Sequence, residues 1–172
     1  EPQQQVDELL GTVKRLGVEE FVDLLLRFPV VVGWMNGHTH LNQILAHGGP
    51  KGGFWEITTA SCIDFPQQQQ VVEIVDNRDG TLSLFTTVLD HAAPVSPGTG
   101  ATTLDLAAQS REFALNDWAE SPTMRRGSPF DRNTELLLPA PFDLSKITDA
   151  ALEAEHVAAR ARVLAHESGL TS

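Results

Sequence analysis

Two histidines separated by one residue are the side chains of this sequence best suited to chemistry. They lie in the tetrapeptide Gly37-His38-Thr39-His40. In a regular strand, residues i and i+2 line one face, but in a loop the two side chains can point in different directions, so the two imidazoles can reach two different metal ions. Imidazole suits zinc, iron, manganese and nickel, and the glycine lets the backbone turn sharply before the pair. We therefore predict that His38 and His40 are metal ligands.

The segment before the histidines predicts where they lie. Val30, Val31 and Val32 form a β-branched run between Pro29 and Gly33, which is typical of a buried strand. We expect this strand over residues 30–35, with the histidines in the loop at its carboxyl end, where active sites of α/β folds gather. Two helices are expected before the strand, because apolar residues recur at helical spacing over residues 6–16 and 18–28.

After residue 53 the apolar pattern changes from helical to strand periodicity. Three strands are predicted as antiparallel neighbours in one sheet, over residues 53–59, 70–75 and 82–89. Asp79-Gly80 supplies the turn between the last two. Gly48, Gly49, Gly52 and Gly53 are interpreted as a turn before the first of these strands. The middle of the chain is thus expected to be a β-meander.

The remainder of the chain differs in character. Residues 92–102 are rich in Pro, Gly, Ser and Thr and indicate a linker or long loop. A helix is expected over residues 104–118, followed by irregular chain over 121–141 and a lightly packed final helix. The predicted organisation is a domain portion over residues 1–91, the linker over 92–102, and a helical and irregular extension over 103–172.

Composition excludes several classes of function. The formal net charge of −11 argues against non-specific binding to nucleic acid and against docking on anionic membranes. Cys62 is the single cysteine, which excludes an internal disulfide and a cysteine-rich zinc site. No apolar stretch approaches the roughly 20 residues of a membrane span. An apolar content of 41% is sufficient for a core.

The stretch from Phe28 to His91 resembles the closing segment of a bacterial subfamily of calcineurin-like metallophosphoesterases. The Gly-His-x-His motif is shared by that whole superfamily, whereas Gly-Phe-Trp-Glu-Ile at residues 53–57 is narrower. The resemblance covers about two thirds of the chain. The matching residues are 27–29, 32–42, 53–61, 64–68, 72–77, 79–83 and 131–136.

The resemblance implies a fold and a function. The fold would be α/β (α+β), the C-terminal part of a metallophosphoesterase-type β-sandwich flanked by helices. His38 would bind one divalent metal ion (zinc, manganese, iron or similar) and His40 the other. A metal-activated water would hydrolyse a phosphate ester, either a small molecule or a nucleotide.

The rest of the superfamily's ligand set is absent from this sequence. No Asp-x-His and no Gly-Asn-His precedes the histidines. The chain is therefore expected to be part of a longer enzyme, inactive by itself, whose missing N-terminal part supplies the other ligands. No catalytic acid or base is assigned within it.

Two other interpretations are open, and two further residues are candidates. In the first alternative, the chain is a β-rich binding module with incidental histidines. In the second, it is a mononuclear metal-binding protein that uses His38, His40 and a carboxylate such as Asp64.

Asn42 would hydrogen-bond near the metals or simply form a turn. His47 is expected in a flexible loop, near substrate or merely exposed.

Overall fold

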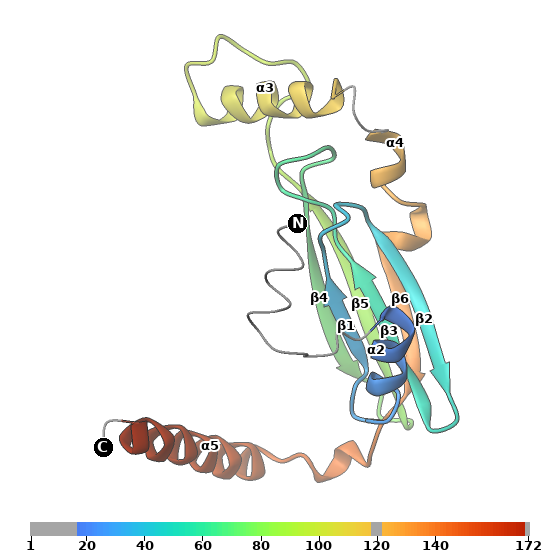
Figure 1. The fold of residues 1–172 in the computed structure, drawn as a ribbon. Helices are drawn as coiled ribbons and strands as arrows, with labels where there is room; N and C mark the ends of the chain where they lie inside the picture. The colour runs from blue at the N-terminus through green and yellow to red at the C-terminus, as the bar shows by residue number, and fades with distance from the viewer. Residues whose placement is uncertain (1–16, 118–121, 171–172) are drawn as a thin grey trace, which may run out of the picture.

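The protein is built around two three-stranded β-sheets packed face to face (Figure 1). The computed structural model describes residues 17–117 and 122–170. The helix expected over residues 6–16 lies outside the described residues. The chain is a mixture of helices and sheets, which confirms the predicted α/β (α+β) class at that level.

The first sheet contains the segment around the two histidines. Its strand order is β1-β3-β2, with β1 parallel to β3 and β2 antiparallel to it. The second sheet has the order β4-β5-β6, with both pairs antiparallel. The bounds are β1 Gly33–Asn36, β2 Gln43–Gly49, β3 Gly52–Thr58, β4 Gln68–Asp76, β5 Thr81–Asp90 and β6 Thr134–Pro139.

The core forms where the inner faces of the two sheets meet. Ile57 of β3 and Leu84 of β5 are both fully buried, at 0% exposure. They lie in one apolar cluster with Leu82, Leu136 and Leu138. Successive side chains of a strand point to opposite faces, so the alternation along β5 and β6 directs this set inward.

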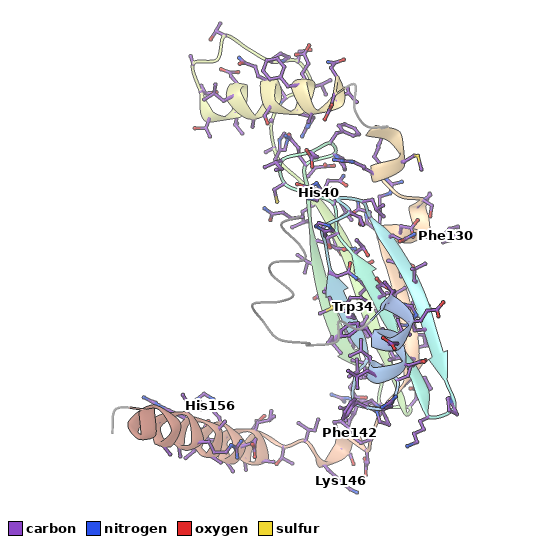
Figure 2. The ribbon with its side chains drawn as sticks, in the orientation of Figure 1. Trp34, His40, Phe130, Phe142, Lys146 and His156 are labelled. Carbon is purple, nitrogen blue, oxygen red and sulfur yellow. The ribbon has the colours of Figure 1, made fainter. Side chains whose placement is uncertain are left out.

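The helices lie around the sandwich. The bounds are α2 Val18–Leu25, α3 Thr103–Leu115, α4 Pro122–Arg125 and α5 Asp149–Leu170, with 3-10 turns η1 Pro129–Asp131 and η2 Leu144–Lys146. Helix α2 packs on the outer face of the first sheet, where Phe21 meets Trp34 edge to face with ring centroids 4.9 Å apart (Figure 2). Helices α3 and α5 lie at opposite ends of the sandwich (Figure 1).

Several strand predictions are wrong in detail. The strand before the histidines begins at Gly33, and Val30 lies in a turn with its side chain 63% exposed. The predicted single meander is divided, because β3 pairs with β1 and β2 while β4 and β5 form the other sheet. The turn at Asp79-Gly80 is confirmed, with Gly80 at a φ of 89°.

Two strands were missed by sequence reasoning. The first is β2: the glycines interpreted as a turn belong to the β2–β3 hairpin, in which Gly48 pairs with Gly53. A Cβ on Gly53 would lie 2.4 Å from the carbonyl oxygen of His47, so glycine is needed within the strand itself. The other is β6, which pairs with β5, so residues 103–172 contribute a strand to the core sheet. The division at residues 92–102 stays a prediction.

One edge of the sandwich is open in the part of the chain that the structure describes. Strands β1 and β4 end their sheets on the same side (Figure 1). Met35 pairs with Ile57, and Ile74 pairs with Leu84, so both side chains point to the inner faces. Each is nevertheless 56% exposed. This edge is an apolar flank of the kind that further strands would cover.

Candidate metal centre

The two histidines lie on the loop of residues 37–42, between β1 and β2. This loop follows the carboxyl end of β1, as predicted, and Figure 2 shows His40 at the end of the sandwich nearest α3. Both histidines have left-handed backbone conformations, with φ of 79° at His38 and 56° at His40. Non-glycine residues seldom adopt this conformation, and such residues cluster at functional sites. His38 is exposed and His40 is partly exposed.

Asp64 is the carboxylate that meets the histidine loop. Its Oδ2 contacts Nδ1 of His40 and lies 3.0 Å from Nη1 of Arg125. Burial raises the pKa of Asp64, but the hydrogen bonds and positive charges of His40 and Arg125 outweigh it, so this pKa lies below its ordinary value. Asp64 is therefore a carboxylate at neutral pH. It arrives from the β3–β4 connection, and Arg125 arrives from α4.

Asn42 closes the loop as a buried cross-link. Its side chain is 1% exposed. Its Oδ1 accepts a hydrogen bond from the backbone N–H of Ala60 at 2.9 Å, and its Nδ2 donates to Gln68 Oε1 at 2.9 Å. Its own backbone N–H donates to the carbonyl of Arg125 at 2.9 Å. Asn42 thus holds together three segments of the site through its polar atoms, which the turn-forming interpretation did not foresee.

His47 lies in a strand, so its prediction as a residue of a flexible loop is wrong. It is in β2, partly buried, with its ring stacked on Phe54 at a centroid distance of 4.8 Å. Its Nε2 lies 2.7 Å from Oε2 of Glu56, whose Oε1 accepts a hydrogen bond from Asn36 Nδ2 at 2.7 Å. This polar cluster lies on the outer face of the first sheet, and sequence periodicity gave no signal for it.

The two imidazoles can bind a metal ion weakly by themselves, but they do not make a complete ligand set. His38 and His40 each offer an imidazole nitrogen, and the His40–Asp64 contact has the chemistry of a metal-binding histidine with its supporting carboxylate. Among residues 17–117 and 122–170, however, no group of three or more His, Cys, Asp or Glu side chains is placed to hold a metal ion. Asp90, a second carboxylate, at the end of β5, accepts a hydrogen bond from Gln68 at 2.9 Å. A bridging carboxylate is thus not among the described residues.

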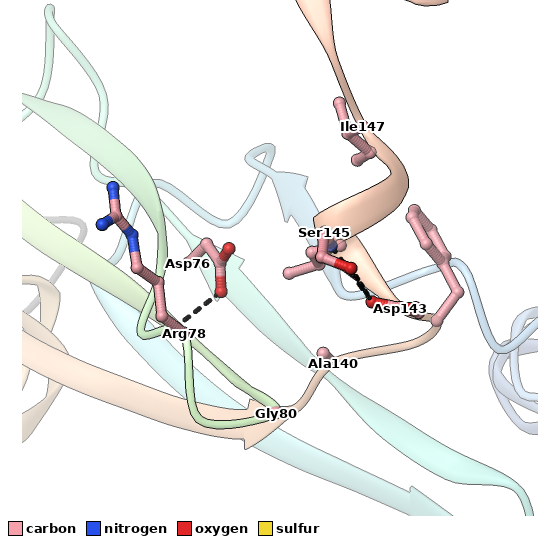
Figure 3. Close-up of a pocket in the computed structure, with 9 residues that line it drawn as sticks. Asp76, Arg78, Gly80, Ala140, Asp143, Ser145 and Ile147 are labelled. Carbon is pink, nitrogen blue, oxygen red and sulfur yellow. Dashed lines mark hydrogen bonds between the residues drawn. The ribbon is translucent and has the colours of Figure 1, made fainter.

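Cavities occur at both ends of the sandwich. One of about 570 Å³ lies between Ile63, Asp64 and the face of α3 that carries Leu106 and Phe113. A second, of about 460 Å³, is formed by the β4–β5 turn and the segment around η2 (Figure 3). Phe142 of that second cavity lies at the opposite end of the sandwich from His40 (Figure 2). The first cavity is lined by Asp64, which contacts His40 of the histidine loop.

Comparison of the chain with protein-family models, with curated proteins and with solved structures finds no match. Within the described part of the chain, no helix has the length and apolar character to cross a membrane. Function is therefore inferred from the residues of the site themselves.

Proposed function

We propose that this chain is the C-terminal part of a binuclear metal-dependent phosphoesterase. In this proposal His38 supplies an imidazole to one divalent metal ion and His40 supplies one to the other. The substrate would be a phosphate ester, either a small molecule or a nucleotide. The observation that carries the proposal is the pair of left-handed histidines on one short loop at the carboxyl end of β1.

Two further features support the proposal. The exposed Met35 and Ile74 mark an edge of the sandwich at which additional strands would find an apolar surface. The same edge is formed by β1, whose carboxyl end leads into the histidine loop. Strands added there parallel to β1 would bring their own carboxyl-end loops close to His38 and His40, and further ligands would lie on such loops.

The metal pair would supply a nucleophilic hydroxide and neutralise charge on the phosphoryl oxygens. The residues of this chain would do two things toward that end. Each histidine would present one neutral ring nitrogen, and Asp64 with Arg125 would hold the loop in place. The carboxylates that bridge the two ions would come from outside the described residues.

The mononuclear alternative keeps one specific observation in its favour, which is the direct contact between His40 and Asp64. In that alternative Asp64 and both histidines bind a single ion. The Asp64 oxygen that contacts His40 also pairs with Arg125, so a metal ion bound through that same oxygen would compete with both partners.

Activity measurements on two proteins test the proposal. The 172-residue chain is expected to hydrolyse neither p-nitrophenyl phosphate nor bis-p-nitrophenyl phosphate with added Zn²⁺ or Mn²⁺. The polypeptide encoded by the upstream-extended reading frame is expected to hydrolyse at least one, and His38→Ala or His40→Ala should each abolish turnover in it.

His156→Ala serves as the matched control, because His156 is exposed on α5, at the other end of the sandwich from His40 (Figure 2). Its turnover should equal that of the unaltered protein. Robust hydrolysis by the 172-residue chain itself would contradict the proposal, as would an upstream reading frame without Asp-x-His and Gly-Asn-His.

A further inference from the structure

We propose that Asp64 is a positioning residue that holds His40 with its Nδ1 protonated and its Nε2 free to bind the metal ion. This inference rests on the proposed function, because it assigns a role to Asp64 within the same site. It goes beyond that function by removing Asp64 from the metal ligands and by including α4 in the site.

The contact between the two side chains fixes which ring nitrogen is available. An ionised carboxylate only accepts hydrogen bonds, so the Nδ1 of His40 that touches Asp64 must carry the proton. The lone pair of a neutral imidazole then lies on Nε2. Histidines that bind metals generally donate their other N–H to a carboxylate or carbonyl, which fixes both the tautomer and the ring orientation.

The same contact argues that Asp64 does not bind the metal ion held by His40. The two nitrogens of an imidazole point away from each other across the ring. A carboxylate seated on Nδ1 therefore lies on the side of the ring opposite to an ion on Nε2. Asp64 would act through His40 and would not touch the ion.

Asp64 is itself held from several directions. Arg125 pairs with its Oδ2 at 3.0 Å, with the arginine side chain only 13% exposed. The carbonyl of Asp64 accepts a hydrogen bond from the backbone N–H of Gln67 at 2.7 Å. The carbonyl of Arg125 in turn accepts from the backbone N–H of Asn42, at the end of the histidine loop. The loop, the β3–β4 connection and α4 therefore form one closed set of contacts.

The tautomer of His40 is the first test, and it needs no metal. Nitrogen-15 NMR of the metal-free 172-residue chain should show His40 as the Nδ1–H form. In Asp64→Ala this preference should be lost, with the Nε2–H form becoming predominant. An Nε2–H form in the unaltered protein would overturn the role of Asp64.

Zinc affinity is the second test, followed by titrating Zn²⁺ against the ring signals of His40. Asp64→Ala should weaken binding by about 10- to 100-fold, which is the usual loss when a supporting carboxylate is removed. Asp64→Asn should fall between Asp64→Ala and the unaltered chain. Arg125→Met should weaken binding in the same direction, since it frees the carboxylate to move.

Asp143→Ala is the matched control. Asp143 also accepts hydrogen bonds within its own turn, from the backbone N–H and hydroxyl of Ser145, but it lines the cavity at the far end of the sandwich (Figure 3). Its zinc affinity should equal that of the unaltered chain. Asp64→Ala with the same affinity as this control would overturn the inference. So would a loss equal to that of His40→Ala, because a ligand would behave that way.

The two tests separate the failure of this inference from the failure of the proposed function. An Nδ1–H tautomer in a chain whose histidines do not respond to Zn²⁺ contradicts the proposed function, and with it any metal-positioning role for Asp64. A response to Zn²⁺ with an Nε2–H tautomer contradicts the role of Asp64 alone.

Discussion

Replacing Asn42 with alanine is expected to destabilise the protein by about 2 to 4 kcal/mol. The magnitude follows from the two shorter of the three hydrogen bonds that the amide makes in a buried position. The N–H of Ala60 loses its acceptor at 2.9 Å, and an orphaned buried donor costs about 1 to 3 kcal/mol. The bond to Gln68 Oε1, also 2.9 Å, contributes about 1 kcal/mol more. Gln68 keeps its second bond, to Asp90, so its own loss is partial.

Urea denaturation monitored by circular dichroism measures this loss as a shift in the midpoint at constant slope. Asn116→Ala is the matched control, since Asn116 is exposed and its amide only donates to the carbonyl of Glu112 at the end of α3. The control should lose about 0.5 kcal/mol or less. If Asn42→Ala is no more destabilising than Asn116→Ala, the assignment of Asn42 as a structural cross-link is refuted.

Three further predictions concern the core, the hairpin and the pH dependence of stability. Leu84→Ala should cost about 2 to 5 kcal/mol in urea denaturation because Leu84 is fully buried between the sheets, whereas Leu137→Ala, on an exposed side chain of β6, should cost about 0.5 kcal/mol or less. His47→Gln should cost about 1 kcal/mol through its lost contact with Glu56 and leave the Zn²⁺ response of His38 and His40 unchanged; a lost response would place His47 in the site. Burial raises the pKa of Asp131, but hydrogen bonds from Ser128 and from the backbone N–H of Ile44 have the larger effect, so its pKa in the folded protein lies below the ordinary value. The carboxylate therefore stabilises the fold above the unfolded pKa of about 4, and this stabilisation is lost as the pH falls from that value through the lower pKa of the folded protein. Asp131→Asn should therefore flatten the acid limb of the stability–pH curve, and an unchanged limb would contradict this cause.

The sequence predicted those strands that are marked by apolar alternation and by a turn signal. The β4–β5 hairpin was predictable because its strands alternate and Gly80 accepts a positive φ in the turn. β2 was missed because Gly48 and Gly49 break the apolar pattern. The close approach of the two strands requires glycine at Gly53 of β3, where a Cβ would lie 2.4 Å from the carbonyl oxygen of His47. β6 was missed because its short apolar run lies among prolines and finds its partner β5 far back in the sequence.

The position of the histidine loop was predictable, but its supporting contacts were not. The Gly-His-x-His spacing and the preceding apolar run were sufficient to place His38 and His40 after a strand. Arg125 meets Asp64 only because α4 folds back onto the β3–β4 connection, and no periodicity encodes such a contact. Asn42 likewise shows its role only when Ala60 and Gln68 are brought beside it.

The measurement that tests the central claim most directly is a Zn²⁺ titration of the 172-residue chain, followed at the ring nitrogens of His38 and His40 by NMR. The same titration is repeated on His38→Ala and on His40→Ala. If the two histidines serve different metal ions, both rings should respond in the unaltered chain, and each should still respond when the other is replaced. Loss of both responses on replacing either one would instead indicate a single shared ion. No response from either ring in the unaltered chain would contradict the assignment of these histidines as metal ligands.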